Sequence, residues 1–223
     1  MRRIGRVMIA AALPLVAGTA AARAQLAGIP VYFNPAGGTG VGVAANLGFP
    51  NTNAGGGTGY GVAASVGGGP VTLTGMVGVR KWSGYSSTEA SYGGDLAYRL
   101  FGGGLLPVAV GVQAGFGQVK IPVVTIAGSS TVTQTTIPVG VGISFNPPLF
   151  PLKPWIAPHV DFTSVSGGGG STSTFHISGG VNFNLLLGLG LHAAVDWGKI
   201  KGTTKSALTF GVGAHFDFHV PMM

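Results

Sequence analysis

The feature that most constrains the fold is an alternation of apolar residues with polar or small ones, which recurs along most of the chain. The clearest example lies between Ser206 and Phe218. As an extended strand, this segment carries on one face Leu208, Phe210, Val212, Ala214, Phe216 and Phe218, and on the other Thr209, Gly211, Gly213, His215 and Asp217. A period of two belongs to a β-strand rather than a helix. The sequence therefore predicts strands with one apolar face.

The same alternation predicts an all-β fold of about ten antiparallel strands, with eight as the alternative count. After residue 24, no apolar stretch reaches the length of about 20 residues that a transmembrane helix needs. The predicted strands cover about 40–49, 57–66, 70–82, 88–101, 105–117, 131–145, 152–164, 172–184, 188–198 and 206–218.

Composition indicates what the apolar face contacts, because soluble β-sandwiches alternate as well. Only 8% of the residues are charged, against about 25% in a water-soluble protein. The polar face holds chiefly Gly, Ser, Thr, Asn and Gln, and it carries all five acidic residues. Thirteen of the 20 aromatic residues lie on the apolar face, several near strand ends, as in the girdles that meet lipid headgroups. The pattern favours lipid contact, with a soluble secreted β-protein as the alternative.

A sheet that crosses lipid must close, because each edge group needs a hydrogen-bond partner. The predicted connections alternate between short turns at 67–69, 102–104 and 185–187 and longer loops, with a Pro-rich corner at 146–148 as the exception. The longer loops are 50–56, 83–87, 118–130, 165–171 and 199–205. Bacterial barrels have short periplasmic turns and longer outer loops. We therefore expect an antiparallel transmembrane up-and-down β-barrel.

Residues 1–24 have the features of a cleaved secretory signal peptide. Arg2, Arg3 and Arg6 precede an uncharged run over 7–22, and Ala22-Arg23-Ala24 fits the cleavage pattern. Four of the twelve Lys and Arg lie in this segment, so cleavage lowers the net charge from +7 to +3. Nucleic acid is therefore not an expected partner. Residues 25–39 are expected to be a lead-in, a plug or an extra strand, residues 40–218 the barrel, and residues 219–223 a C-terminal tail.

The signal peptide, the alternating strands and the aromatic last strand from Phe210 to Phe218 resemble those of small outer-membrane β-barrel proteins of Gram-negative bacteria. The resemblance implies a location in the bacterial outer membrane. Members of this group commonly end on an aromatic residue that the insertion machinery recognises, which implies that role for Phe218. This chain departs from the pattern because five further residues follow.

The polar strand faces are expected to form a network inside the barrel. Counting across loop 83–87 places Arg80 opposite Glu89 or Ser91, and Arg80 is expected to pair with Glu89. Asp95 and Arg99 lie four residues apart on one strand, close enough to be bridged. The predicted lumenal set is Arg80, Glu89, Asp95, Arg99, His159, Asp161, His176, His192, Asp196, His215 and Asp217.

Four of these residues form a second constellation. Turn 185–187 places Asp196 opposite His176, and loop 165–171 places His176 near His159 or Asp161. Two imidazoles and two carboxylates suit structural hydrogen bonds, a divalent metal or a water poised for hydrolysis. Omptin-type membrane proteases also use Asp and His on a ten-stranded barrel, but none of their motifs is matched here. Structural pairing is the favoured interpretation, so we predict no catalytic residue, metal or cofactor.

The remaining features concern partners and function. Interior glycines either leave a passage or make room for larger side chains. We expect a structural or surface-interaction barrel with a mostly filled lumen; the alternatives are a narrow channel for small solutes and a barrel enzyme that uses the His and Asp cluster. The outer-end lysines, expected to meet either lipopolysaccharide phosphates or solvent, are Lys81, Lys120, Lys199, Lys201 and Lys205.

Overall fold

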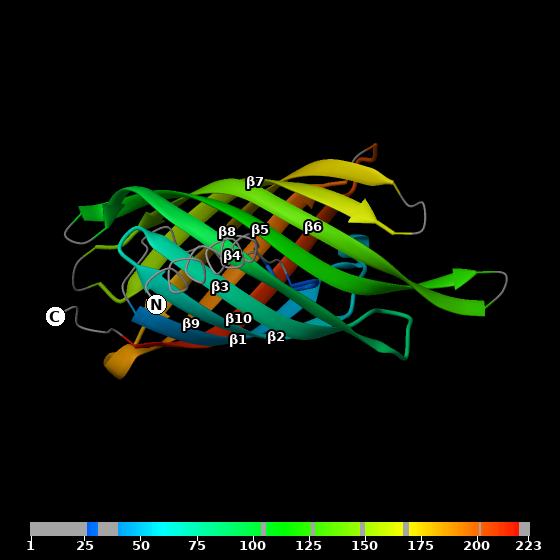
Figure 1. The fold of residues 1–223 in the computed structure, drawn as a ribbon, viewed down its shortest axis with the longest axis horizontal. Helices are drawn as coiled ribbons and strands as arrows, with labels where there is room; N and C mark the ends of the chain where they lie inside the picture. Colours follow the sequence, from blue (N-terminus) through cyan, green and yellow to red (C-terminus); the bar gives the residue numbers. More distant parts are fainter. Residues whose placement is uncertain are drawn as a thin grey trace, which may run out of the picture.

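The computed structural model describes residues 26–30, 40–103, 106–125, 128–147, 150–166, 170–200 and 202–218. Within these residues, ten antiparallel strands close into a barrel (Figure 1). Each strand pairs with its sequence neighbours, and the first strand pairs with the last. The predicted fold and the count of ten strands are confirmed. The predicted signal peptide, residues 31–39 and the tail 219–223 lie outside the described residues.

The strand bounds follow the predicted alternation closely, apart from one long hairpin. Two 3₁₀ turns, η1 (Thr52–Ala54) and η2 (Leu186–Gly188), join strands. Among the described residues, no helix has the length and apolar character needed to cross a membrane. The strands are β1 (Gly40–Pro50), β2 (Thr58–Gly68), β3 (Val71–Lys81), β4 (Thr88–Gly103), β5 (Leu106–Thr125), β6 (Gly128–Phe145), β7 (Leu152–Val165), β8 (Ser171–Asn184), β9 (Leu189–Lys199) and β10 (Ser206–Phe218).

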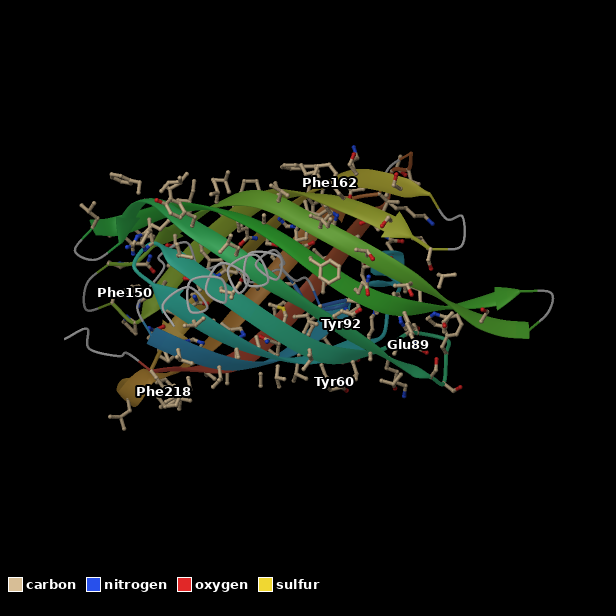
Figure 2. All side chains as sticks on the ribbon, in the orientation of Figure 1. Tyr60, Glu89, Tyr92, Phe150, Phe162 and Phe218 are labelled. Carbon is tan, nitrogen blue, oxygen red and sulfur yellow. The ribbon has the colours of Figure 1, made fainter. Side chains whose placement is uncertain are left out.

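The apolar faces of the strands form the outer surface of the barrel. Val77 is 57% exposed, Phe162 51% and Tyr60 49%. The side chains of Phe162 and Tyr60 project from opposite sides in Figure 2. Isolated apolar residues are ordinary on soluble proteins, but a continuous apolar belt is the surface that a barrel presents to lipid.

The two ends of the barrel differ. We call the end where β1 begins and β10 finishes the termini end; its connections are 69–70, 104–105, 146–151 and 185–188. We call the opposite end the loop end; its connections are 51–57, 82–87, 126–127, 166–170 and 200–205. Four of the five loop-end connections are long, with five to seven residues, and the exceptions to the predicted pattern are the two-residue β5–β6 connection and the six-residue connection 146–151 at the termini end.

The predicted loop 118–130 is wrong, because β5 and β6 continue through it. Their pairing extends as far as Thr125 opposite Gly128. Beyond Val119 and Gln134, the two strands pair only with each other among the described residues, and they project past the rest of the barrel as a ribbon (Figure 1). The segment is rich in Val, Ile and Thr, whose branched side chains favour extended backbone.

The inner face combines polar residues with a small apolar cluster. Trp155 on β7 is 6% exposed and packs with alanines from three strands: Ala97, Ala157 and Ala194. This cluster fills part of the cross-section of the barrel.

Candidate functional site in the barrel lumen

Residues Leu26–Pro30 lie inside the barrel and belong to none of its strands. Leu26 is 2% exposed and Ile29 is 3% exposed. The backbone N–H of Ile29 donates to the carbonyl of Leu26 at 3.0 Å, and Gly28 has a left-handed φ of 81°. A compact turn from the N-terminal region therefore occupies the lumen. We call it the lumenal turn.

Glycines on the inner wall make the space for the lumenal turn. A Cβ atom at Gly48 would overlap the backbone of Gly28. A Cβ at Gly78 would lie 3.1 Å from the Leu26 side chain, and one at Gly61 would overlap that side chain. These residues belong to two directly opposed pairs on β1–β3, namely Gly48 with Gly59 and Gly61 with Gly78. The inner glycines of this wall hold the chain's own backbone rather than an open passage.

Arg80 closes the lumen on the loop side of the turn. It lies directly opposite Glu89 as counted, but no ion pair joins them within the described part of the chain. Its Nη2 instead donates to the carbonyls of Ala54 at 2.6 Å and Gly56 at 3.1 Å, and the guanidinium lies 3.5 Å from the Trp82 ring centroid. The arginine therefore anchors the loop 51–57 over the barrel mouth.

Asp95 and Arg99 occupy the inner face of β4, as predicted from their spacing. Asp95 is 8% exposed, and its register partner on β3 is Thr74. Arg99 reaches the termini end, where its Nη2 donates to the Gly69 carbonyl at 3.4 Å. The two residues therefore lie at successive depths along one side of the lumen.

The predicted His and Asp constellation is assembled on β7, β8 and β9. We call His159, Asp161, His176 and Asp196 the loop-side cluster. His159 and His176 are directly opposed across β7 and β8, and their ring centroids lie 5.5 Å apart. The His159 Nε2 lies 3.5 Å from Asp161 Oδ1 and 3.4 Å from Asp196 Oδ2. The side chains of His159, Asp161 and Asp196 are at most 5% exposed, so the cluster is enclosed by protein.

Three of the four residues of the loop-side cluster have a defined hydrogen-bond partner: His159, His176 and Asp196. The Nδ1 of His159 lies 3.0 Å from the Ala157 carbonyl, and the Nδ1 of His176 lies 2.8 Å from Asp196 Oδ1. The other oxygen of Asp196 accepts a hydrogen bond from Ser178 Oγ at 2.5 Å. The predicted register was off by two residues, because Asp196 lies opposite Ser178 and Gly198 lies opposite His176.

The other two described histidines form a second cluster, on β9 and β10. We call Asn46, His192, His215 and Asp217 the termini-side cluster. His192 Nε2 lies 2.7 Å from Asn46 Oδ1, and the Nδ1 atoms of His192 and His215 lie 3.2 Å apart. His215 Nε2 is 3.7 Å from Asp217, whose side chain is 45% exposed. Hydrogen bonds join Asn46, His192 and His215, and a longer contact leads from His215 to Asp217 on the solvent side.

Each described histidine ring lies beside a glycine on the adjoining strand. The directly opposed residues are Gly140 for His159, Gly198 for His176, Gly213 for His192 and Gly190 for His215. A Cβ atom at any of these glycines would overlap the histidine facing it. The missing side chains leave room for imidazole rings in a narrow barrel.

No protein-family model and no curated protein matches the sequence. The β domain of the Bordetella autotransporter BrkA superposes with a TM-score of 0.53 and 13% identity, over 80% of this chain and 99% of that one. The chain has the fold of an outer-membrane β-barrel. The N-terminal barrel of Pseudomonas aeruginosa OprF matches with a TM-score of 0.44, 15% identity and coverage of 82% and 99%. Ail of Yersinia pestis matches with a TM-score of 0.44 and 12% identity, over 81% of this chain and 99% of that one.

The basic residues of this outer-membrane-type β-barrel gather at its loop end. Lys81 and Lys199 are exposed at the ends of β3 and β9, and Lys205 is exposed in the last loop. Lys120 is exposed on β5 where the ribbon begins. Lys201 lies outside the described residues. A cationic rim therefore surrounds one mouth of the barrel, while Lys153 lies at the opposite end.

Three contributors to the lumen were missing from the predicted set. Trp155 fills the interior, Ser178 binds Asp196, and Asn46 binds His192. Trp155 lies four residues before His159 on β7, and Ser178 lies two residues after His176 on β8. Both therefore point to the same face as those histidines, and the alternation could have predicted them. The lumenal turn gave no comparable signal, because neither alternation nor charge distinguishes it.

Proposed function

We propose that this chain is an outer-membrane barrel whose lumen is closed by its own residues, and that it acts in membrane structure and surface contact. The outward apolar belt supports insertion in lipid, and the features of residues 1–24 support export. The enclosed loop-side cluster supports a non-enzymatic role, because His159 has a side chain that is 0% exposed and offers a substrate no access.

The lumenal turn is the observation that carries the closed-lumen proposal. It rests directly on the glycine pairs of β1–β3, and the Arg80 guanidinium lies on its loop side. A glycine-rich wall in an open pore would face water, whereas this wall contacts backbone and the side chain of Leu26. Solutes would have to displace the turn in order to pass.

Planar-bilayer recording of the chain without residues 1–24 tests this proposal. We expect no stable open steps from the wild-type barrel. Gly48→Val should produce steps, because its side chain would displace the Gly28 backbone from the wall. Gly75→Val is the matched control, since a Cβ there meets nothing within 4 Å. A stable open current from the wild type would overturn the proposal.

A narrow channel is the second candidate, and one cavity favours it. A cavity of about 180 Å³ lies beside the lumenal turn and is large enough for a few water molecules. Its lining includes ionisable and amide side chains that could guide a small polar solute: Asp95, Gln113, His192, His215 and Asp217. On this alternative, the same recording would give small steps for the wild type and for Gly75→Val alike.

The surface role rests on the two features that protrude at the loop end. The β5–β6 ribbon has no paired strand along its outer edges beyond Val119 and Thr133 within the described residues, and such edges can pair with another chain. The exposed lysines Lys81, Lys199 and Lys205 supply cationic donors for lipopolysaccharide phosphates.

Phe218, 53% exposed at the end of β10, is proposed as the residue that the insertion machinery recognises.

Vesicles with and without lipopolysaccharide test the lipid contact. Lipopolysaccharide should raise the urea concentration at which the barrel unfolds. The Lys81→Glu and Lys199→Glu double variant should lose that increase, because reversed charges repel phosphates. Lys153→Glu, a single charge reversal at the termini end, is the control and should keep the increase. Equal responses of the double variant and the wild type would contradict the contact.

A further inference from the structure

The loop-side cluster fixes the protonation of both imidazoles on their Nδ1 atoms. A backbone carbonyl only accepts, so the Ala157 contact at 3.0 Å requires a proton on Nδ1 of His159. A carboxylate likewise accepts, so the Asp196 contact at 2.8 Å requires a proton on Nδ1 of His176. Each neutral ring then presents the lone pair of its Nε2 atom to the other groups of the cluster.

Those lone pairs face carboxylate oxygens rather than hydrogen-bond donors. The Nε2 of His159 lies 3.5 Å from Asp161 Oδ1, and neither atom has a hydrogen-bond partner although both are buried. The Nε2 of His176 lies 3.9 Å from the other oxygen of Asp161. Two lone pairs around a buried carboxylate repel unless a cation lies between them.

The spacing fits a metal ion better than a shared proton. A charge-assisted N–H···O bond is about 2.7–2.9 Å long, whereas the atoms here lie 3.4 and 3.5 Å apart. Two ligands of a tetrahedral ion, each bound at about 2.0–2.1 Å, are about 3.3–3.4 Å apart. The ligand atoms offered by His159, Asp161 and His176 all lie within 4.8 Å of one another.

We propose that His159 Nε2, His176 Nε2 and the Asp161 carboxylate bind one zinc-class divalent ion, while Asp196 holds His176 through its other ring nitrogen. Two imidazoles select this class over magnesium or calcium, which take oxygen ligands. The ion also neutralises two carboxylates whose ion-pair partners among the described residues are the two histidines alone.

The surroundings are those of a structural site. Asp196 holds the Nδ1 proton of His176, and Ala157 holds that of His159, which are the outer contacts that orient metal-binding histidines. The ligands come from the adjacent strands β7 and β8, so the ion joins these two strands, and Asp196 ties β9 to His176. Burial of His159 leaves no open position for a substrate.

Zinc titration of the untagged, chelator-treated barrel in detergent tests the proposal. We expect one zinc per folded chain. His159→Ala and His176→Ala should each weaken binding at least about 100-fold. His192→Ala and His215→Ala are matched controls from the termini-side cluster and should bind zinc as the wild type does. Heat-modifiable gel migration, the resistance of folded barrels to SDS until boiling, checks folding.

Asp161→Asn keeps the volume of the ligand and replaces its charge, so it tests the site if an alanine variant fails to fold. It should also lose zinc affinity. Folded wild-type barrel that holds no zinc would overturn the proposal. Equal zinc affinity in the wild type and folded Asp161→Asn would overturn it as well. Because the conductance test does not involve these residues, its outcome is separate from this one.

Discussion

The two histidine clusters share their geometry but differ in their chemistry. In each, a pair of rings stacks across neighbouring strands, with centroids 5.5 and 5.4 Å apart. Each also contains the pattern His-x-Asp on one strand, at His159 to Asp161 and at His215 to Asp217. The loop-side carboxylate is 5% exposed, whereas the side chain of Asp217 is 45% exposed. The same His-x-Asp pattern thus lies in an enclosed site in the loop-side cluster and reaches solvent in the termini-side cluster.

The difference arises from the third strand of each cluster. On β9, Asp196 adds a second buried carboxylate beside the first ring pair. On β1, Asn46 offers a neutral amide oxygen to His192, which therefore carries its proton on Nε2. Cross-strand register sets the ring stacking, and the neighbouring strand decides whether the rings present lone pairs or N–H groups. The following predictions compare matched variants in the two clusters.

The largest difference in stability is expected between His159→Ala and His215→Ala. Removing His159 leaves Asp161 and Asp196 buried without one of the two histidines that contact them, which costs about 3–5 kcal/mol. Removing His215 breaks a contact near solvent and costs about 1 kcal/mol. Urea unfolding in detergent measures both. Equal losses would show that the clusters do not differ in burial energetics.

Glycine substitutions should separate the clusters by a smaller amount. Gly198→Ala and Gly190→Ala each place a Cβ against a histidine ring, which should cost about 1–3 kcal/mol in unfolding free energy. Only Gly198→Ala should also weaken zinc binding, because His176 must move. Gly75→Ala serves as the control for an unobstructed site. Loss of zinc binding in Gly190→Ala would contradict the assignment.

The smallest effects are expected at the polar partners. Ser178→Ala and Asn46→Ala each remove one hydrogen bond and should cost about 1 kcal/mol in unfolding free energy. Ser178→Ala should in addition weaken zinc binding about 10-fold, because its hydroxyl orients Asp196. Parallel urea and zinc titrations measure both quantities. A zinc effect of equal size in the two variants would remove the distinction between the clusters.

The alternation was sufficient to predict ten strands and which face of each points inward, because strand parity fixes that face. It placed His176 near His159 or Asp161, and the register shows His176 opposite His159. The position of Asp196 was displaced, because five residues rather than the three assumed lie between the directly opposed Asn184 and Gly190, in a turn with a left-handed Leu187. Two extra residues move the partner of His176 by two, from Asp196 to Gly198.

Contacts with irregular backbone could not be predicted in this way. Arg80 binds the carbonyls of loop 51–57, whose conformation depends on η1 and on left-handed glycines rather than on strand pairing. The lumenal turn is likewise held by the shape of the glycine wall. Both depend on the closed barrel, so the local pattern of the strands did not contain them.

Zinc-edge X-ray absorption of the loaded, untagged barrel tests the contrast between the clusters most directly. The geometry predicts nitrogen and oxygen ligands at about 2.0–2.1 Å and the scattering of two imidazole rings. The zinc spectrum should be the same in His192→Ala and in His215→Ala. A zinc spectrum without imidazole scattering, or one that loses it in those two variants, would contradict the assignment of the metal to the loop-side cluster.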